Sequence, residues 1–385
     1  MTNEKYNLEI KLRIQDIEKD DWNNLAKKLH NPFYEWEWLL NLEESKSVSQ
    51  KTGWQPLYFL LYLDKELHGI APLFLKNHSY GEFIFDQSFA RLAQDLNLAY
   101  YPKLIGMSPY SPIEGYQFIY KENSDKQEIT EILLNYIEVF AKKNNILSCN
   151  FLYIDKDWEK LLTKYNFHKW INIRSQWDSI GEANFEEFLN RFNSNQRKNI
   201  KKERKSIINQ KIKIKVFNEN NINDDLMNSM HFFYEQHCLR WGVWGSKYLT
   251  NDFFKNSLET KENLIIFSAY EETSTKPIAM SMCVKNKECL WGRYWGSLKE
   301  IKYLHFELCY YQPIEWAIKN KIKYFDPGAG GQHKRRRGFY AKETISLHKW
   351  FNYNMENIIV QWLNKVNPET LNAIEDENHS IPFKN

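Results

Sequence analysis

A short segment near the end of the chain joins flexible backbone to concentrated positive charge. It reads FDPGAGGQHKRRRGFY, residues 325–340, and it follows an apolar run that has the character of a buried strand. Glycine amides can turn toward the oxygens of an anion, and neighbouring cations add longer-range attraction. The pattern therefore predicts an anion-binding loop, and a flexible surface turn with solvated charges is the alternative. The predicted contributors are Gly328, Gly330, Gly331, Lys334, Arg337 and Gly338.

A carboxylate and a tyrosine lie just before that strand, in YLHFELCYYQPIEWAIKN, residues 303–320. Glu307 and Tyr311 are four residues apart, so they share one face of an α-helix. This spacing makes Glu307 a candidate general base and Tyr311 a candidate proton donor, while a buried structural carboxylate is the alternative. His333 is the other candidate base, because an ordinary imidazole pKa of about 6.5 suits the task. Pro313 is expected to kink this helix or split it.

An arginine stands between aromatic residues in ECLWGRYWGS, residues 288–297. Arg293 could bind an anion or could be a stacked structural ion. Its neighbours Gly292 and Gly296 would admit a ligand, although a strand bulge would need them equally. We count Arg293 among the candidate ligand-binding residues.

A helix rich in cations is expected to begin at about Phe185, in FEEFLNRFNSNQRKNIKKERKSII. Glu203 is the one acidic residue among the cations of 197–205. Such a face could be simply solvated, or it could be a platform for a polyanion such as a nucleotide, coenzyme A or RNA.

Composition narrows the class of protein. The chain has 385 residues, of which 16% are aromatic, so it is folded and long enough for two domains. The net charge of +3 is too small to indicate a nucleic-acid binder by itself. The five cysteines form no CxxC pair, no metal-ligand spacing or nucleophile elbow occurs, and no metal is expected. With no signal peptide or membrane span in the sequence, a cytoplasmic protein is expected.

Two parts of the sequence repeat one order of elements. Residues 58–77 and 264–286 each read as a hairpin, and 136–154 and 313–328 each read as a helix followed by a strand. The repeat predicts two mixed α/β domains, residues 1–178 and 179–385. The first copy carries an insertion, 78–117, that is dense in Tyr, Phe, Pro and Gly, and such long loops are usually functional. Four of its residues are predicted to bind substrate: Tyr80, Asp86, Tyr101 and Lys103.

Several of these stretches, among them YYPKLIGMSPYSPIEG, GRYWGS, HFELCYYQPIEWAI and DPGAGGQHKRRRGF, resemble the FemAB-like family of peptidoglycan biosynthesis and recognition. That family is related to the GNAT acyltransferases and to the Fem-type aminoacyltransferases. The resemblance covers nearly the whole chain. It implies an α/β fold of tandem GNAT-like domains, each a mixed sheet flanked by helices, and an N-acyltransferase activity.

Two functions of different classes follow from the sequence. The first is an N-acyltransferase that takes an acyl group from acyl-CoA, or an aminoacyl group from aminoacyl-tRNA. The acceptor would be a small-molecule or peptide amine, such as a cell-wall precursor or a metabolite. The second is a non-catalytic protein on the same scaffold that recognises an anionic glycan, peptide or RNA, because a fold does not determine a function.

Overall fold

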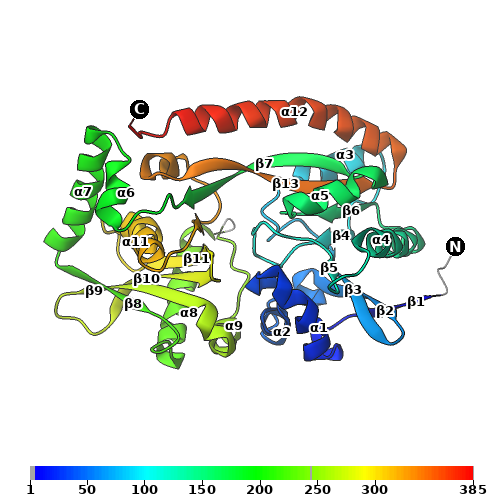
Figure 1. Ribbon diagram of the computed structural model, residues 1–385, viewed down its shortest axis with the longest axis horizontal. Coiled ribbons are helices and arrows are strands. Elements are labelled where there is room, and N and C mark those ends of the chain that lie inside the picture. The colour runs from blue at the N-terminus through cyan, green and yellow to red at the C-terminus, as the bar shows by residue number, and fades with distance from the viewer. Residues whose placement is uncertain (1–4, 243–244, 385) are drawn as a thin grey trace. The chain divides into compact units, whose positions relative to one another are not determined.

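The computed structural model describes residues 5–242 and 245–384 (Figure 1). Two compact units are present: Met1–Asn172 with Thr344–Leu371, and Ile173–Glu343 with Asn372–Asn385. These units are defined by their compactness, whereas the predicted boundary came from the repeated order of elements along the chain. The domain boundary between residues 178 and 179 therefore stays a prediction. Within the described residues, no helix has both the length and the apolar character needed to cross a membrane.

The first unit contains a mixed sheet with the strand order β1-β2-β3-β4-β6-β13. Neighbours are antiparallel except β4 and β6, which are parallel, and a short strand, β5, pairs with β3. The strands are β1 (Tyr6–Lys11), β2 (Trp54–Leu63), β3 (Glu66–Lys76), β4 (Lys103–Gly106), β5 (Ile119–Tyr120), β6 (Ser148–Phe151) and β13 (Tyr340–Trp350), of which this unit holds residues from Thr344 onward. The helices are α1 (Lys19–Ala26), α2 (Trp36–Glu44), α3 (Gln87–Asp95), α4 (Lys126–Lys143), α5 (Lys156–Leu162) and most of α12 (Tyr353–His379).

The second unit contains a mixed sheet with the strand order β8-β9-β10-β11-β12-β7. Only β11 and β12 are parallel. The strands are β7 (His168–Asp178), of which this unit holds residues from Ile173 onward, β8 (Ile212–Phe217), β9 (Leu264–Glu271), β10 (Pro277–Lys285), β11 (Cys289–Ser297) and β12 (Tyr324–Asp326). The helices are α6 (Phe185–Asn190), α7 (Ser194–Asn209), α8 (Asp224–Arg240), α9 (Asn251–Asn256), α10 (Leu304–Phe306), α11 (Gln312–Lys319) and the 3₁₀ helix η9 (Gln332–Arg337).

The two sheets follow one plan, which confirms the predicted repeat. The hairpins β2-β3 and β9-β10 take the second and third places in their sheets. In each unit a helix, α4 or α11, then leads into the strand that makes the parallel pairing, β6 or β12. The supposed insertion is partly a sheet element, because it contains β4, the counterpart of β11.

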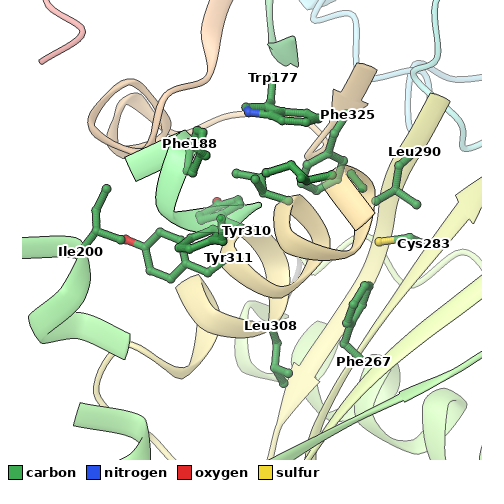
Figure 2. Close-up of a cluster of buried hydrophobic side chains, with 14 of the residues drawn as sticks. Trp177, Phe188, Ile200, Phe267, Cys283, Leu290, Leu308, Tyr310, Tyr311 and Phe325 are labelled. Atoms are coloured by element: carbon green, nitrogen blue, oxygen red, sulfur yellow. The ribbon is translucent and has the colours of Figure 1, made fainter. Parts of the chain in front are cut away.

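The core of the second unit surrounds the segment from α10 to α11. Figure 2 shows Tyr310 and Tyr311 on this segment, between the green helices α6 and α7 and the yellow strands. Phe267, Leu290 and Phe325 are fully buried on the strands of this cluster. Each large apolar side chain buried in this way contributes about 1.5 to 3 kcal/mol. Packing therefore fixes the helical segment that carries Glu307, one of the two candidate bases.

The cation-rich helix expected from Phe185 is interrupted. It forms α6 and then α7, with Arg191–Asn193 between them. The side chain of Asn193 accepts a hydrogen bond from the Gln196 amide at 2.9 Å, which caps α7. Asparagine competes for backbone amides and favours a helix start over a helix interior, which explains the break.

Pro313 changes the helical register instead of ending the helix. Glu307–Tyr311 forms a π-turn between α10 and α11, and the Gln312 amide bonds to the Glu307 carbonyl, five residues back. In this register the Leu308 carbonyl would accept a hydrogen bond from the amide of residue 313, but proline has no N–H to donate. The Ser281 hydroxyl donates to the Leu308 carbonyl at 2.7 Å and supplies the missing bond.

Gly296 on β11 permits close packing of α8. A Cβ at Gly296 would lie 1.9 Å from the carbonyl oxygen of Phe233, whereas a Cβ at Gly292 would lie 3.4 Å from Pro327, an ordinary contact. The two glycines of this strand therefore have different tolerance for a side chain.

We expect Gly296→Ala to lower the free energy of unfolding by about 3 kcal/mol, because the backbone of α8 must move. Gly292→Ala is the matched control on the same strand and should cost less than about 1 kcal/mol. Urea unfolding followed by circular dichroism measures both. Equal destabilisation by the two variants would contradict this packing.

Candidate functional site

The glycine-rich loop after β12 is held by its own polar residues. The Gly328 amide donates to Asp326 Oδ1 at 2.7 Å, and Lys334 Nζ donates to the carbonyls of Gly328 at 2.7 Å and Ala329 at 3.1 Å. Lys334 is buried, and that burial lowers its pKa to about 8. The lysine predicted to bind an anion therefore contacts the loop's own backbone.

The loop glycines differ in surroundings. Gly330 has a φ of +74°, and no atom lies within 4 Å of where its Cβ would be, so this position is open to a ligand. Gly338 has a φ of +83°, and its Cβ would meet Phe192 at 2.9 Å, so its role is in packing. Gly328 and Gly331 also have positive φ values. The open part of the loop is therefore centred on Gly330.

The side chain of Arg337, on η9, binds the carboxylate of Glu203 on α7, and the same carboxylate also binds the π-turn. Its guanidinium lies 3.4 Å from the centre of the Phe306 ring and donates to both oxygens of Glu203 on α7, at 2.9 and 3.0 Å. The Tyr311 hydroxyl, from the π-turn, donates to the same carboxylate. Arg337 also donates to the His333 carbonyl at 2.9 Å. Glu203 thus fastens η9 and the π-turn to α7.

His333 is an imidazole in a cationic and aromatic setting. Its Nε2 lies 2.9 Å from the Tyr310 hydroxyl, and its ring is near those of Phe306 and His305. Although the residue is exposed overall, partial burial lowers its pKa, and the charges of Arg337 and Lys334 act in the same direction. The ring is therefore neutral near pH 7, the form that can accept a proton.

A cavity of about 390 Å³ lies where α7, η9 and the start of the α10 helix meet. It is lined by three cations, one carboxylate, two amides, an imidazole and two aromatic rings: Lys202, Arg336, Arg337, Glu203, Gln196, Asn199, His333, Tyr303 and Phe306. His333 also lines a second cavity, of about 680 Å³, with Arg335 and Glu377. The predicted base His333 therefore lines two cavities.

Glu307 faces a different cavity. It lines a groove of about 530 Å³ with Arg204 and Lys205. Its carboxylate is buried and accepts hydrogen bonds from Arg204 at 3.0 Å and from Gln312 at 2.8 Å. Because the turn is π-helical, the side chain that contacts Glu307 is that of Gln312, five positions later. The Tyr311 hydroxyl donates to Glu203 instead. The structure does not bring Glu307 and Tyr311 together as the α-helical spacing predicted.

Arg293 occupies a bulge in β11. The register with β10 passes from Met282 opposite Tyr294 to Cys283 opposite Gly292, which leaves Arg293 as the extra residue. Its guanidinium lies 5.7 Å from the centre of the Tyr294 ring. The predicted role of Arg293 in ligand binding stays a prediction.

In the first unit, three of the four predicted substrate residues meet. Lys103 is fully buried and donates to Glu82 at 2.8 Å and to Ser79 at 3.0 Å, and it also contacts Asp86. The Tyr101 hydroxyl lies 2.7 Å from Ser79 Oγ. Tyr80 is 63% exposed and is the one of the four that is open to solvent. Lys103 and Asp86 therefore form an internal ion pair that holds the loop 79–86.

Several residues of these sites were not identified from the sequence. In the sequence, Glu203 and Arg204 are members of a charged run, and a single acid among six cations is a signal for an internal partner. Tyr310 is not indicated by α-helical spacing from Glu307, which selects Tyr311. Nothing in the sequence marked Glu82, which becomes important only when the loop folds over Lys103. Among the described residues, no three His, Cys, Asp or Glu side chains gather as metal ligands would.

Three kinds of comparison relate the chain to known proteins. A sequence model of the FemAB-like family, described as "Peptidogalycan biosysnthesis/recognition", matches residues 13–385. No curated protein sequence matches the chain. The crystal structure of FemX has a TM-score of 0.53 at 13% identity, over 92% of this chain and 100% of that one. L-PGS from Bacillus licheniformis has a TM-score of 0.50 at 8% identity, over 84% and 95%. A tandem GNAT protein from the clavulanic acid biosynthesis pathway has a TM-score of 0.47 at 8% identity, over 89% and 98%.

The ion pair between Arg204 and Glu307 yields a prediction about stability. Arg204→Met should lower the free energy of unfolding by about 3 kcal/mol, because it leaves the buried Glu307 carboxylate without its cation. Glu307→Gln should then restore part of the loss, with a coupling of about 1 kcal/mol or more in a double-mutant cycle. Chemical denaturation of the four proteins measures it.

Lys201→Met is the matched control on α7, because the ion pair of Lys201 with Glu186 is exposed to solvent. It should lower the free energy of unfolding by less than about 1 kcal/mol. Strictly additive effects of the Arg204 and Glu307 variants would show that the pair is not coupled.

Proposed function

The chain belongs to the FemAB-like family, and on that premise we propose that it transfers an acyl or aminoacyl group from a phosphate-bearing donor to an amine. The donor would be acyl-CoA or aminoacyl-tRNA. The acceptor would be a cell-wall precursor or a small metabolite carrying a free amine, and the reaction would take place in the cytoplasm. The observation that carries this proposal is that the His333 imidazole lines a cationic cavity beside the open Gly330 loop.

The transfer needs a neutral amine, because a protonated amine has no electron pair with which to attack. In the tautomer in which Nε2–H donates to the Tyr310 hydroxyl, Nδ1 of His333 is the proton acceptor. The amine nitrogen forms a bond to the donor carbonyl carbon, and the carbon–sulfur or carbon–oxygen bond to the carrier breaks. The proton passes from the amine to Nδ1 and then to the departing sulfur or oxygen.

No covalent enzyme intermediate is required in this scheme. Burial raises the pKa of all five cysteine thiols, so none is an activated nucleophile: Cys149, Cys238, Cys283, Cys289 and Cys309. Amides in the open part of the loop, at Gly330 and Gly331, are candidates to stabilise the negative charge that develops on the carbonyl oxygen. In the first unit, the exposed Tyr80 and the half-buried Tyr101 are proposed to contact the acceptor, while Asp86 and Lys103 hold their loop.

We expect His333→Asn to lower the rate of transfer by about 100-fold or more, because it removes the proton acceptor. The assay incubates the protein with labelled aminoacyl-tRNA or labelled acetyl-CoA and a fraction of low-mass amines that includes peptidoglycan precursors, and it measures label in new amide bonds. Glu307→Gln is the comparison and should keep the rate within about threefold when both variants are assayed below their melting temperatures.

A reversed result, with loss only in Glu307→Gln, would make Glu307 the base. Absence of transfer from either donor, with binding retained, would favour the non-catalytic protein that recognises an anionic glycan, peptide or RNA.

The pH dependence gives a further test. Because the pKa of His333 is lowered, kcat/KM should show a rising limb with an apparent pKa below about 6.5, in addition to any limb of the acceptor amine itself. A pH profile in which every rising limb lies above pH 7.5 would contradict His333 as the base.

A further inference from the structure

We propose that a groove of about 760 Å³ in the second unit is a docking site for an acidic segment of a partner protein. The groove lies between the loop that follows β7 and the end of α11, and its lining residues all fall between Ser179 and Lys323, within that unit. We call it the α11 groove. His333 and the Gly330 loop do not line it, so the proposal goes beyond the proposed function and does not depend on it.

The α11 groove opens where two paired segments of the chain separate. Tyr324 on β12 lies opposite Asp178 on β7, and the Ser179 amide continues this ladder by donating to the Lys323 carbonyl at 2.9 Å. Past that bond, one segment turns toward α6 through Gly181, which has a φ of +91°, and the other comes from the end of α11. The groove is therefore formed by the connections of the sheet.

The floor of the α11 groove is apolar. Phe185 on α6, Ile318 on α11 and Ile322 before β12 line it, and all three are buried. Ile180 stands between two lining residues and is 70% exposed, so an unburied apolar side chain lies at the edge of the groove. A small molecule that filled the groove would leave Ile180 in water, whereas a protein segment could bury apolar side chains against both.

The backbone at the groove has few hydrogen-bond donors left for a ligand. In the loop before α6, the Gly181 amide donates to Ser179 Oγ at 3.1 Å and the Ile180 amide donates to Glu182 Oε2 at 2.9 Å. The Ala183 amide donates to a carboxylate of α6 at 2.8 Å. A phosphate or carboxylate group held by these amides would have to replace internal bonds. Recognition at this groove therefore depends on its apolar floor and on charged side chains.

The charges that are not balanced at the α11 groove are positive. Lys319 and Lys321 line it, are exposed, and form no ion pair within residues 5–242 and 245–384. The two acids of the lining, Glu182 and Glu315, are each bonded to an arginine, at 2.7 and 2.6 Å. A third lysine, Lys323, bonds to an exposed glutamate. Charge complementarity therefore selects an acidic partner, and the floor selects one with apolar side chains.

The experiment uses the full chain, labelled at its isoleucine methyl groups, and three synthetic peptides of equal length. The first contains leucine and glutamate, the second has lysine in place of glutamate, and the third has serine in place of leucine. The first should shift the methyl NMR signals of Ile180, Ile318 and Ile322. Its Kd should be lower than those of the other two peptides by about tenfold or more, because only it matches both the floor and the charge.

The double variant Lys319→Glu with Lys321→Glu should weaken binding of the leucine–glutamate peptide by about tenfold or more and strengthen binding of the lysine peptide. Lys261→Glu with Lys276→Glu is the matched control, because it makes the same change in net charge at two exposed lysines that do not line the groove. The control should change the Kd by less than about threefold, since exposed charges at a distance are screened.

Equal weakening by the two double variants, or equal binding of the glutamate and lysine peptides, would overturn the proposal. Shifts of equal size at Ile208 would also overturn it, because Ile208 is an exposed isoleucine of the separate groove that Glu307 lines. Absence of shifts at Ile318 and Ile322 would do the same. Shifts there with dodecanoate but with none of the peptides would assign the groove to an acyl-chain anion in place of a protein segment.

Discussion

The carboxylate of Glu203 is the contact on which the second unit's site depends. It accepts two hydrogen bonds from Arg337 and one from Tyr311, so a single acidic residue of a basic helix holds both η9 and the π-turn. The pair with Arg337 is largely buried, where removal of one partner leaves an uncompensated charge. Loss of Glu203 would therefore release the segment that carries His333 as well as the wall of the cavity.

The π-turn explains how the carboxylates of Glu203 and Glu307 come to bind different partners. By widening the helix before Pro313, it directs Tyr311 to Glu203 and places Gln312 against Glu307. Glu307 is then enclosed by Arg204 and Gln312 in a groove that His333 does not line. Its bonds are those of a carboxylate that anchors α7 to the helix, and this is the reason for proposing the imidazole as the base.

The sequence predicted what depends on local pattern. Alternating apolar runs identified the hairpins β2-β3 and β9-β10, and helical periodicity identified α4 and α11, so the repeat and the fold class follow directly. The exceptions depend on tertiary contacts. The π-turn depends on the hydroxyl of Ser281 on β10, which bonds the Leu308 carbonyl. The bulge at Arg293 depends on the register between β10 and β11. Residues 344–371 belong to the first unit although they lie far along the chain. Charge patterning located the basic helix but could not show which cation each acid would pair with.

The titration of the site's two basic groups sets conditions for its chemistry. The pKa of His333 lies below 6.5, so the imidazole is neutral above that value and able to accept a proton. The pKa of Lys334 is about 8, so below that pH its ammonium makes charge-assisted bonds to the carbonyls of Gly328 and Ala329, which are stronger than those of a neutral amine. Between the two values the base is free and the loop is most firmly held. Burial lowers both pKa values, because desolvation disfavours the charged form of each group. The packing that shapes the loop therefore also adjusts the proton affinity of the residue proposed to act on it.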